Sequence, residues 1–282
     1  MFEENYERGD FDIGGKDGKI VSVTEDKLIK QLSRERNGNV PNTDRMEYDS
    51  SAFYRAEAMA FGSKKPTLSN KQLLRIPRIV SNLKLYNVVK IYEILENCAL
   101  LRGNPGYVMK RYYHSLDYTK RNFDGTYKRK SLLDFDLKYF IDNYHRLDSD
   151  LKVLWENGIS PNDISYVDGN CIFSDEGIIL IDVDGYTWLS SLDKLRDKLG
   201  LKTKTLKYDA NKMINGYIRE AIELLDSRRK KEIMSGVDWT QISLDENFDL
   251  LEELSKYDPS MTLFEYIKIK SEELGYTRKG TR

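Results

Sequence analysis

Cysteine and histidine are scarce in this chain, with two of each among 282 residues. Cys98 and Cys171 are too few for a disulfide framework, and they lack the spacing of a zinc site. His114 and His145 belong to no recognisable metal-binding pair or serine-hydrolase pattern. The sequence therefore argues against disulfide-stabilised and zinc-dependent classes, and it favours a reducing compartment.

Long apolar runs and an excess of one charge are also lacking. The 45 basic and 46 acidic side chains leave a formal net charge of -1, so no overall field favours nucleic acid or a membrane surface. No apolar segment approaches the length that spans a membrane, and residues 1–10 are acidic and polar, unlike a signal peptide. We therefore expect a cytoplasmic protein with no membrane partner.

The composition is sufficient for a substantial core. Hydrophobic residues make up 40% of the chain, and its length suits one large domain or two modest ones. Neither an internal repeat nor a low-complexity segment divides the sequence. Composition alone leaves both possibilities open.

The first third of the chain has the pattern of a small antiparallel sheet. Residues 19–23 and 27–30 alternate in character on either side of a polar turn, which predicts a hairpin with glycines at its mouth. Residues 88–94 and 107–109 predict two more strands, joined through a Gly-Asn-Pro-Gly turn at 103–106.

Helices are predicted between these two hairpins. Apolar residues near helical spacing favour one helix over 46–60, and Ser69 is suited to cap a second one. Pro77 should kink or stop that second helix before Ile79, because proline lacks an amide hydrogen.

The remainder of the chain is expected to be mainly helical. An apolar stripe over 140–154 predicts a long helix that ends at Gly158, and further helices are predicted over 213–225 and 250–274. A third hairpin, over residues 171–181, interrupts them. The fold class indicated is α+β.

Carboxylate and amide side chains gather around this third hairpin, in residues 159–186. Asp163 and Asn170 precede it, and Asp182 and Asp184 follow its second strand. A strand that delivers an aspartate at its end offers a rigid ligand to a hard cation such as Mg²⁺, and an upstream Asn adds a neutral oxygen.

This ordered set resembles the protein-kinase-like superfamily, whose catalytic loop and following strand carry such residues. The resemblance implies a single kinase-like domain over 1–282 with a bilobal fold. A small antiparallel-sheet N-lobe would cover 11–112, and a mainly helical C-lobe would cover 113–282. It also implies that Asp163 is the catalytic base, and that Asn170 and Asp182 bind Mg²⁺. Asp184 would assist Asp182, as the second acidic residue does in choline-kinase-like and aminoglycoside-phosphotransferase-like members.

The resemblance extends to the first hairpin and assigns a nucleotide-binding role there. Gly14, Gly15 and Gly18 would let backbone amides approach the phosphates of ATP, and Lys30 on the following strand would pair with those phosphates. In this superfamily a helix glutamate holds the strand lysine, and Glu57 is the candidate for that partner.

Residues 107–112 resemble the last N-lobe strand and the hinge of a kinase. Met109 would shape the adenine pocket, and Lys110 and Tyr112 would offer backbone contacts to the base. Taken alone, these residues are better explained by an ordinary edge strand, and it is the downstream segment over 170–184 that favours the hinge.

The sequence also departs from the family pattern. Pro161 stands where a histidine usually precedes the catalytic aspartate, and Asp163 and Asn170 lie two residues farther apart than in the family loop. Residues 182–184 differ from the usual opening of an activation segment, and the motif that closes such a segment is not found. These differences argue against a conventional regulated protein kinase.

Two functions remain open. One is an ATP- and Mg²⁺-dependent phosphotransferase acting on an acceptor hydroxyl of a protein or a small molecule; the other is an inactive pseudokinase that serves as a protein-interaction module. A nucleic-acid partner is suggested only by basic and aromatic residues interleaved over 110–130, for which a solvated loop is the better explanation. The acceptor, the oligomeric state and the pathway are not encoded in any motif that we recognise.

Overall fold

The computed structural model describes most of the predicted elements. Described residues are 14–15, 18–24, 26–32, 69–96, 101, 103–112, 132–161, 170–203, 205–223 and 249–273. The predicted helix over 46–60 lies outside them.

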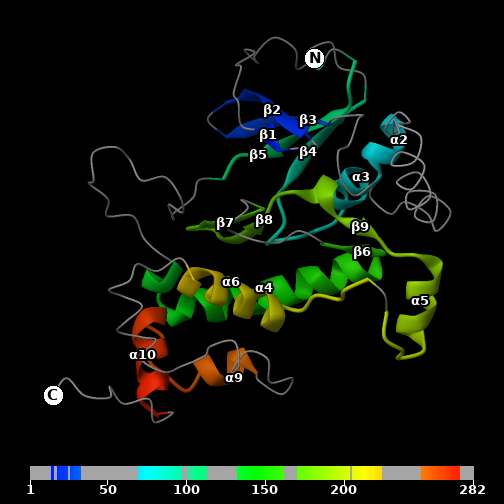
Figure 1. Cartoon of the computed structure of the whole chain (residues 1–282). Coiled ribbons are helices and arrows are strands. Elements are labelled where there is room, and N and C mark those ends of the chain that lie inside the picture. Colours follow the sequence, from blue (N-terminus) through cyan, green and yellow to red (C-terminus); the bar gives the residue numbers. More distant parts are fainter. Residues whose placement is uncertain are drawn as a thin grey trace, which may run out of the picture. The chain divides into compact units, whose positions relative to one another are not determined.

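A five-stranded antiparallel sheet forms the first part of the chain (Figure 1). Its strands run in the order β1-β2-β3-β5-β4. They are β1 (Gly14–Gly15), β2 (Gly18–Val23), β3 (Lys27–Leu32), β4 (Ile91–Leu95) and β5 (Gly106–Lys110). The first hairpin predicted from the sequence is therefore confirmed, and so is the pairing of β4 with β5.

The buried position of β5 explains its apolar sequence. Its neighbours are β3 and β4, and its first four residues are buried. Val108 pairs with Ile29 of β3, and both pack with Leu101 and Leu95 in a small apolar cluster. Burial of this cluster stabilises the pairing of β3 with β5, although the two strands are far apart in sequence.

The helical segment before β4 differs from its prediction. Ser69 caps α2 (Asn70–Leu73) through a reciprocal capping box with Gln72, as the sequence indicated. The break falls at Leu74, and α3 (Arg75–Ser81) then continues through Pro77 and past Ile79. Pro77 lies in the first turn of α3, where its missing amide hydrogen costs nothing, so the interruption precedes proline and does not follow it.

Strand β4 is shorter than predicted, because its expected first residues pair elsewhere. Val88 forms a parallel bridge with Leu180, and the amide of Val89 donates to the carbonyl of Leu180 over 2.8 Å. The amide of Leu180 in turn donates to the carbonyl of Asn87 over 2.8 Å. The segment before β4 is thus hydrogen-bonded to a residue about ninety positions later in the chain.

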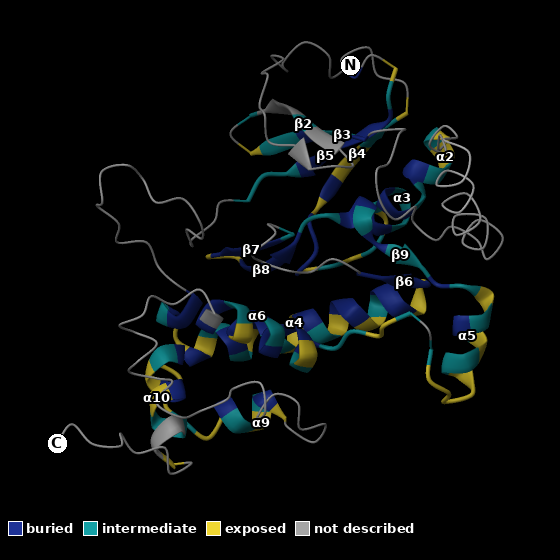
Figure 2. Cartoon of the chain, viewed as in Figure 1, coloured by how far each residue is buried: buried dark blue, intermediate teal, exposed yellow. Residues whose placement is uncertain are grey.

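The long helix is confirmed as α4 (Leu137–Glu156). Its apolar stripe is buried and its opposite face is exposed, as Figure 2 shows. Gly158 has a φ of 76°, which permits the turn into β6 (Ile159–Ser160). Strand β6 pairs with β9 (Thr187–Trp188), and α5 (Ser191–Lys198) follows after the N-cap Ser190.

The third hairpin is confirmed as β7 (Cys171–Ser174) and β8 (Gly177–Leu180). The ring of Phe173 on β7 meets Tyr217 of α6 (Ala210–Glu223) edge to face, with 5.3 Å between the ring centroids. Most described side chains of α6 are buried or half-buried, and those of Lys212 and Arg219 are exposed (Figure 2).

The last predicted helix is divided in two. Residues 250–274 form α9 (Leu250–Leu254) and α10 (Leu263–Glu273), with a loop that contains Pro259 between them. Thr262 and Glu265 exchange capping hydrogen bonds of 2.9 and 3.2 Å at the start of α10. These capping bonds favour a new helix start over a continuous helix.

The described residues form a mixed α+β structure, with small antiparallel sheets and seven α-helices. The chain divides into two compact units. The first unit comprises Met1–Tyr112, Asp150–Asp163 and Leu180–Lys207; the second comprises Tyr113–Ser149, Ile164–Ile179 and Tyr208–Arg282. Among the described helices, each is too short or too polar to cross a lipid bilayer.

Candidate functional site

Lys30 and the two aspartates that follow β8 meet in the first unit. The Nζ of Lys30 forms ion pairs with Asp182 Oδ1 and, over 2.6 Å, with Asp184 Oδ1. These residues are separated by more than 150 positions in the sequence. The structure thus brings together a lysine and two aspartates that the sequence had assigned to one nucleotide site.

Backbone hydrogen bonds hold the two aspartates in place. Leu180 is paired with the segment before β4, so the end of β8 is anchored in the first unit. The chain then enters η4 (Val183–Gly185), in which the amide of Gly185 donates to the carbonyl of Asp182 over 2.9 Å. Helix α3 packs against η4, and the buried side chain of Val183 supports the same turn.

Strand register places Lys30 on the same face of the sheet as Met109, another predicted site residue. Lys30 lies directly opposite Tyr107, and Leu28 lies opposite Met109. Because side chains alternate along a strand, all four point to the same face, which is opposite to that of Val108. Met109, predicted to shape an adenine pocket, therefore shares its face with the predicted phosphate-binding lysine.

Tyr107 completes the hydrogen bonding at the buried aspartate. Its hydroxyl donates to Asp184 Oδ1 over 2.7 Å, and its ring is fully buried. The same oxygen accepts from Lys30, so two strands each supply a donor to one carboxylate. Tyr107 lies in the predicted strand and hinge segment, but no site role was assigned to it from the sequence. Its position two residues before Met109 was a signal, because residues i and i+2 share a strand face.

The two aspartates differ in how far their side chains are buried. The side chain of Asp184 is 1% exposed, whereas that of Asp182 is 32% exposed. Burial alone would lower the pKa of Lys30, but the negative charges of Asp184 and then of Asp182 raise it above its ordinary value. Lys30 is therefore a cation at neutral pH, and Asp182 is the carboxylate with access to solvent.

The partly exposed carboxylate of Asp182 is of the type that Mg²⁺ takes as a ligand. Mg²⁺ prefers oxygen ligands, and in nucleotide sites one or two carboxylates and the phosphates suffice to hold it. Among the described residues there is no group of three or more His, Cys, Asp or Glu side chains suited to a metal ion.

Other predicted site residues are described only in part. The backbone of Gly14, Gly15 and Gly18 forms the β1–β2 hairpin, with Gly15 paired to Gly18. Asn170 is half-buried and immediately precedes β7 in the second unit. Asp163 and Glu57 lie outside the described residues, so their predicted roles stay predictions.

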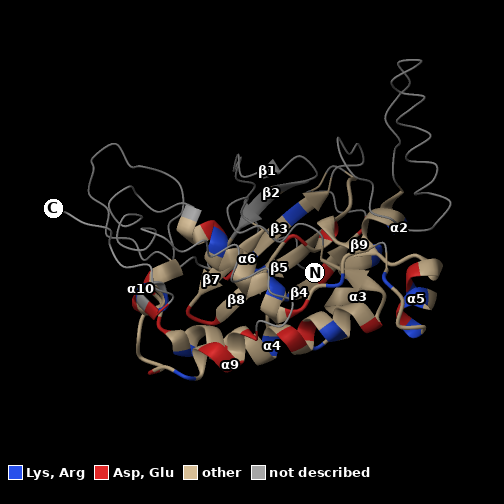
Figure 3. Cartoon of the chain, turned by 60° about the horizontal axis from the view of Figure 1, so that its bottom comes forward, with Lys and Arg blue, Asp and Glu red and all other residues tan. Residues whose placement is uncertain are grey.

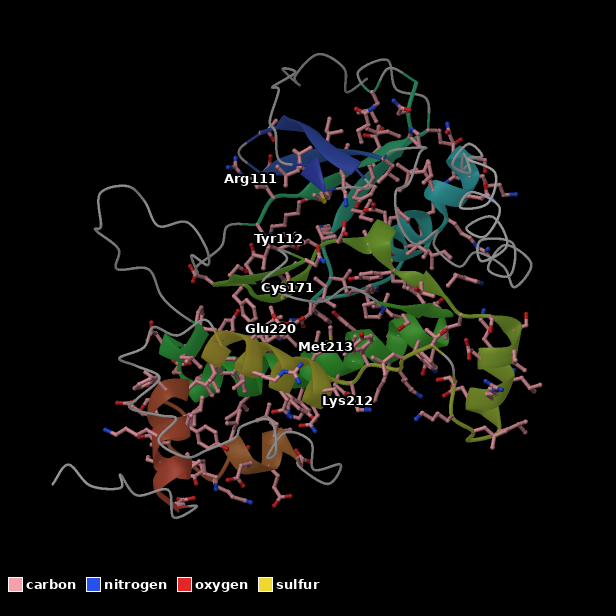
Figure 4. The ribbon with its side chains drawn as sticks, viewed as in Figure 1. Arg111, Tyr112, Cys171, Lys212, Met213 and Glu220 are labelled. Atoms are coloured by element: carbon pink, nitrogen blue, oxygen red, sulfur yellow. The ribbon has the colours of Figure 1, made fainter. Side chains whose placement is uncertain are left out.

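The predicted hinge follows β5 directly (Figure 4). The amide of Lys110 donates to the carbonyl of Lys90 over 2.8 Å, so this N–H would have to leave Lys90 in order to bind a base. The amide of Arg111 donates to the carbonyl of Asp26 over 2.8 Å, and the ammonium of Lys110 lies 4.9 Å from the ring centroid of Tyr112. These contacts define the path of the chain as it leaves the sheet.

Cys171 is not suited to act as a nucleophile. It is buried on β7, in the same unit as Met213 and Glu220 of α6. Figure 4 labels these three residues. Burial raises the pKa of its thiol to about 12, although a hydrogen bond with Tyr217 opposes the shift. The thiol is therefore protonated at neutral pH, and a low thiol pKa is what cysteine catalysis requires.

The described helices do not present a surface of one charge. Basic and acidic side chains are interspersed along α4 and α5, as Figure 3 shows. Most of the basic stretch over 110–130 that suggested nucleic acid lies outside the described residues. The interspersed charges on these two helices do not form the basic patch typical of a nucleic-acid interface.

A scan against models of known protein families and a search of curated proteins both found no match to this chain.

Proposed function

We propose that this chain is a kinase-like phosphotransferase that binds ATP with Mg²⁺ and transfers the terminal phosphoryl group to an acceptor hydroxyl. The observation that carries the proposal is the ion pairing of Lys30 with Asp182 and Asp184. Protein kinases carry their phosphate-binding lysine on the third strand of the small sheet, and a metal-binding aspartate later in the chain. Lys30 is on β3, and Asp182 follows β8.

The roles of the residues follow from their charge and exposure. Lys30 would bind the phosphates, and Asp182 would hold Mg²⁺. The metal-binding role of Asn170, which lies in the second unit, stays a prediction of the kinase resemblance. Bound Mg²⁺ would neutralise charge that develops on the transferring group. Asp163 would orient the acceptor hydroxyl and accept its proton, and Met109 would line the adenine pocket on the face that it shares with Lys30.

The ion pair between Lys30 and Asp182 also favours a second candidate. In a pseudokinase the ammonium of Lys30 would remain on Asp182 and take the place of the metal, and the domain would serve as a protein-interaction module. The departures around Asp163 agree with this alternative. The two candidates differ in whether Mg²⁺ increases nucleotide binding.

Nucleotide-dependent stabilisation tests both candidates. We expect ATP with Mg²⁺ to raise the melting temperature of the wild type, because a ligand at 100 times its Kd stabilises the native state by about 2.7 kcal/mol. Lys30→Met and Asp182→Asn should abolish most of this shift. The measurement is a thermal-shift titration with ATP, with and without Mg²⁺.

Lys27→Met is the matched control, because Lys27 lies on the same strand three residues earlier and points to the opposite face. It should retain the full shift. Stabilisation by ATP that is the same with and without Mg²⁺, and the same in Asp182→Asn, would favour the pseudokinase. A wild-type melting temperature that does not change with ATP and Mg²⁺ would refute nucleotide binding altogether.

A further inference from the structure

Lys30 and Tyr107 converge on the same oxygen of Asp184. They are directly opposite each other on β3 and β5, and their donor atoms lie 2.6 and 2.7 Å from Asp184 Oδ1. Asp184 and Tyr107 are buried. A buried carboxylate is tolerated when it is paired and hydrogen-bonded, as this one is.

The helices described near this site offer Lys30 no acidic partner. In protein kinases a helix glutamate pairs with the strand lysine and keeps it directed at the phosphates. Helices α2 and α3, which precede β4, have the sequences NKQL and RIPRIVS and contain no Asp or Glu. The described contacts that fix the ammonium come from the aspartates after β8.

We propose that Asp184, held by the hydroxyl of Tyr107, is the permanent counter-ion that positions Lys30 for the nucleotide phosphates. Asp184 thereby performs the task of the helix glutamate. Asp182 would release its ion pair with Lys30 when it binds the metal. This inference rests on the proposed function, and it assigns Asp184 and Tyr107 as positioning residues of the same site.

The different exposure of the two aspartates supports this division of labour. A metal ligand must be reached by the cation and the phosphates, and Asp182 keeps about a third of its side chain accessible. Asp184 is enclosed, and one of its oxygens already accepts two hydrogen bonds from the sheet. Metal binding at Asp184 would require the loss of contacts with both strands, whereas metal binding at Asp182 would displace its ion pair with Lys30.

Two titrations separate a counter-ion from a metal ligand. The first varies ATP at saturating Mg²⁺, and the second varies Mg²⁺ at fixed ATP, with thermal stabilisation as the readout. Tyr107→Phe removes one hydroxyl and should raise the half-saturating ATP concentration about tenfold, as expected for a lost hydrogen bond to a charged group. It should leave the half-saturating Mg²⁺ concentration unchanged, whereas Asp182→Asn should raise that concentration.

Tyr92→Phe is the control, because the ring of Tyr92 on β4 is exposed. A double-mutant cycle gives the decisive comparison. If Tyr107 acts through Lys30, Tyr107→Phe should have no further effect on ATP affinity in a Lys30→Met background. Asp184→Glu, which keeps the charge, should bind ATP better than Asp184→Asn.

The outcomes distinguish the two proposals. A wild type that binds ATP, together with a Tyr107→Phe variant of equal affinity, would overturn the positioning role alone. An Asp184→Asn variant whose Mg²⁺ requirement rises as it does in Asp182→Asn would make Asp184 a metal ligand instead. A wild type that binds no ATP would overturn the proposed function, and this inference with it.

Discussion

Asp150 shows how a buried polar residue holds two distant segments together. It lies on the buried stripe of α4, and its Oδ2 accepts from the amides of Tyr86, over 2.7 Å, and Asn87. The carboxylate thus satisfies two backbone donors in the segment that leads to β4. The sequence contained a signal for this residue, because Asp150 falls in helical register with Leu147 and Leu154 on the apolar stripe.

Removing this acceptor should destabilise the protein. Asp150→Ala leaves the two backbone donors without their carboxylate, and we expect a loss of about 1–3 kcal/mol in the free energy of unfolding. Denaturant titration of the variant and the wild type measures this loss. Equal midpoints and slopes would contradict the role of Asp150.

The charge of Asp150 should also make stability depend on pH. Burial raises the pKa of its carboxyl above the ordinary value, although the amides of Asn87 and Tyr86 oppose the shift. The native state then binds the proton more tightly than the unfolded chain, so this residue's contribution to stability falls as pH rises from the ordinary aspartate range through the native pKa. Asp150→Asn keeps an oxygen acceptor and abolishes that fall.

Denaturant unfolding from about pH 4 to pH 8 is the appropriate measurement, since it starts near the ordinary pKa of aspartate. The stability of Asp150→Asn relative to the wild type should increase over the lower part of this range and become constant once the native pKa is passed. A difference that decreases with rising pH would show that the pKa is lowered in the native state.

At the scale of elements, the close approach of β5 to β3 depends on Gly106. Gly106 pairs with Gln31 of β3 and Leu95 of β4. A Cβ atom at this position would lie closer than 3.0 Å to the carbonyl oxygen of Lys30 and to Leu101 Cδ1. A side chain there would therefore force β5 away from the strand that carries Lys30.

We expect Gly106→Ala to lower the free energy of unfolding by about 1–3 kcal/mol, as overpacking typically does. It should also weaken stabilisation by ATP, because the backbone of Lys30 is displaced. Gly216→Ala is the control: Gly216 lies within α6 with nothing within 4 Å of a Cβ, so alanine there should stabilise the helix. A Gly106→Ala variant as stable as the wild type would show that β5 can move away from β3 without loss of free energy of unfolding.

At the scale of the whole molecule, the first compact unit is discontinuous in sequence. Residues beyond Tyr112 contribute Asp150 and Leu180, which bond the segment before β4. The first segment of this unit ends at Tyr112, and the unit also includes Asp150–Asp163 and Leu180–Lys207. The division into two lobes at residue 112 that the kinase resemblance implies stays a prediction.

A fragment of residues 1–112 should consequently fail to fold on its own. It lacks the acceptor for Tyr86 and Asn87 and the strand partner of Val88, and it exposes the apolar surface that these segments cover. The amide proton–nitrogen NMR spectrum of the fragment should be poorly dispersed, in contrast to that of the full chain. A well-dispersed fragment spectrum would show that residues 1–112 are an autonomous unit.

Local pattern alone determined much of this protein. Hydrophobic periodicity predicted α4, and glycine and polar turns predicted the three hairpins. Ser69, a residue type that favours the N-cap position, predicted the start of a helix. Each of these features depends on residues a few positions apart, so the sequence contains the whole cause. The wrong predictions at Pro77 and in residues 250–274 also have local causes, namely a tolerated first-turn proline and an unrecognised cap at Thr262.

Only the tertiary structure decided which distant residues meet. The sequence marked Lys30, Asp182 and Asp184 by type and order, but it could not separate the buried aspartate from the exposed one or select Tyr107 as their neighbour. The pairing of β3 with β5 and of Leu180 with the segment before β4 sets these contacts. Such pairings depend on the burial of side chains from several elements at once, which no short stretch of sequence can specify.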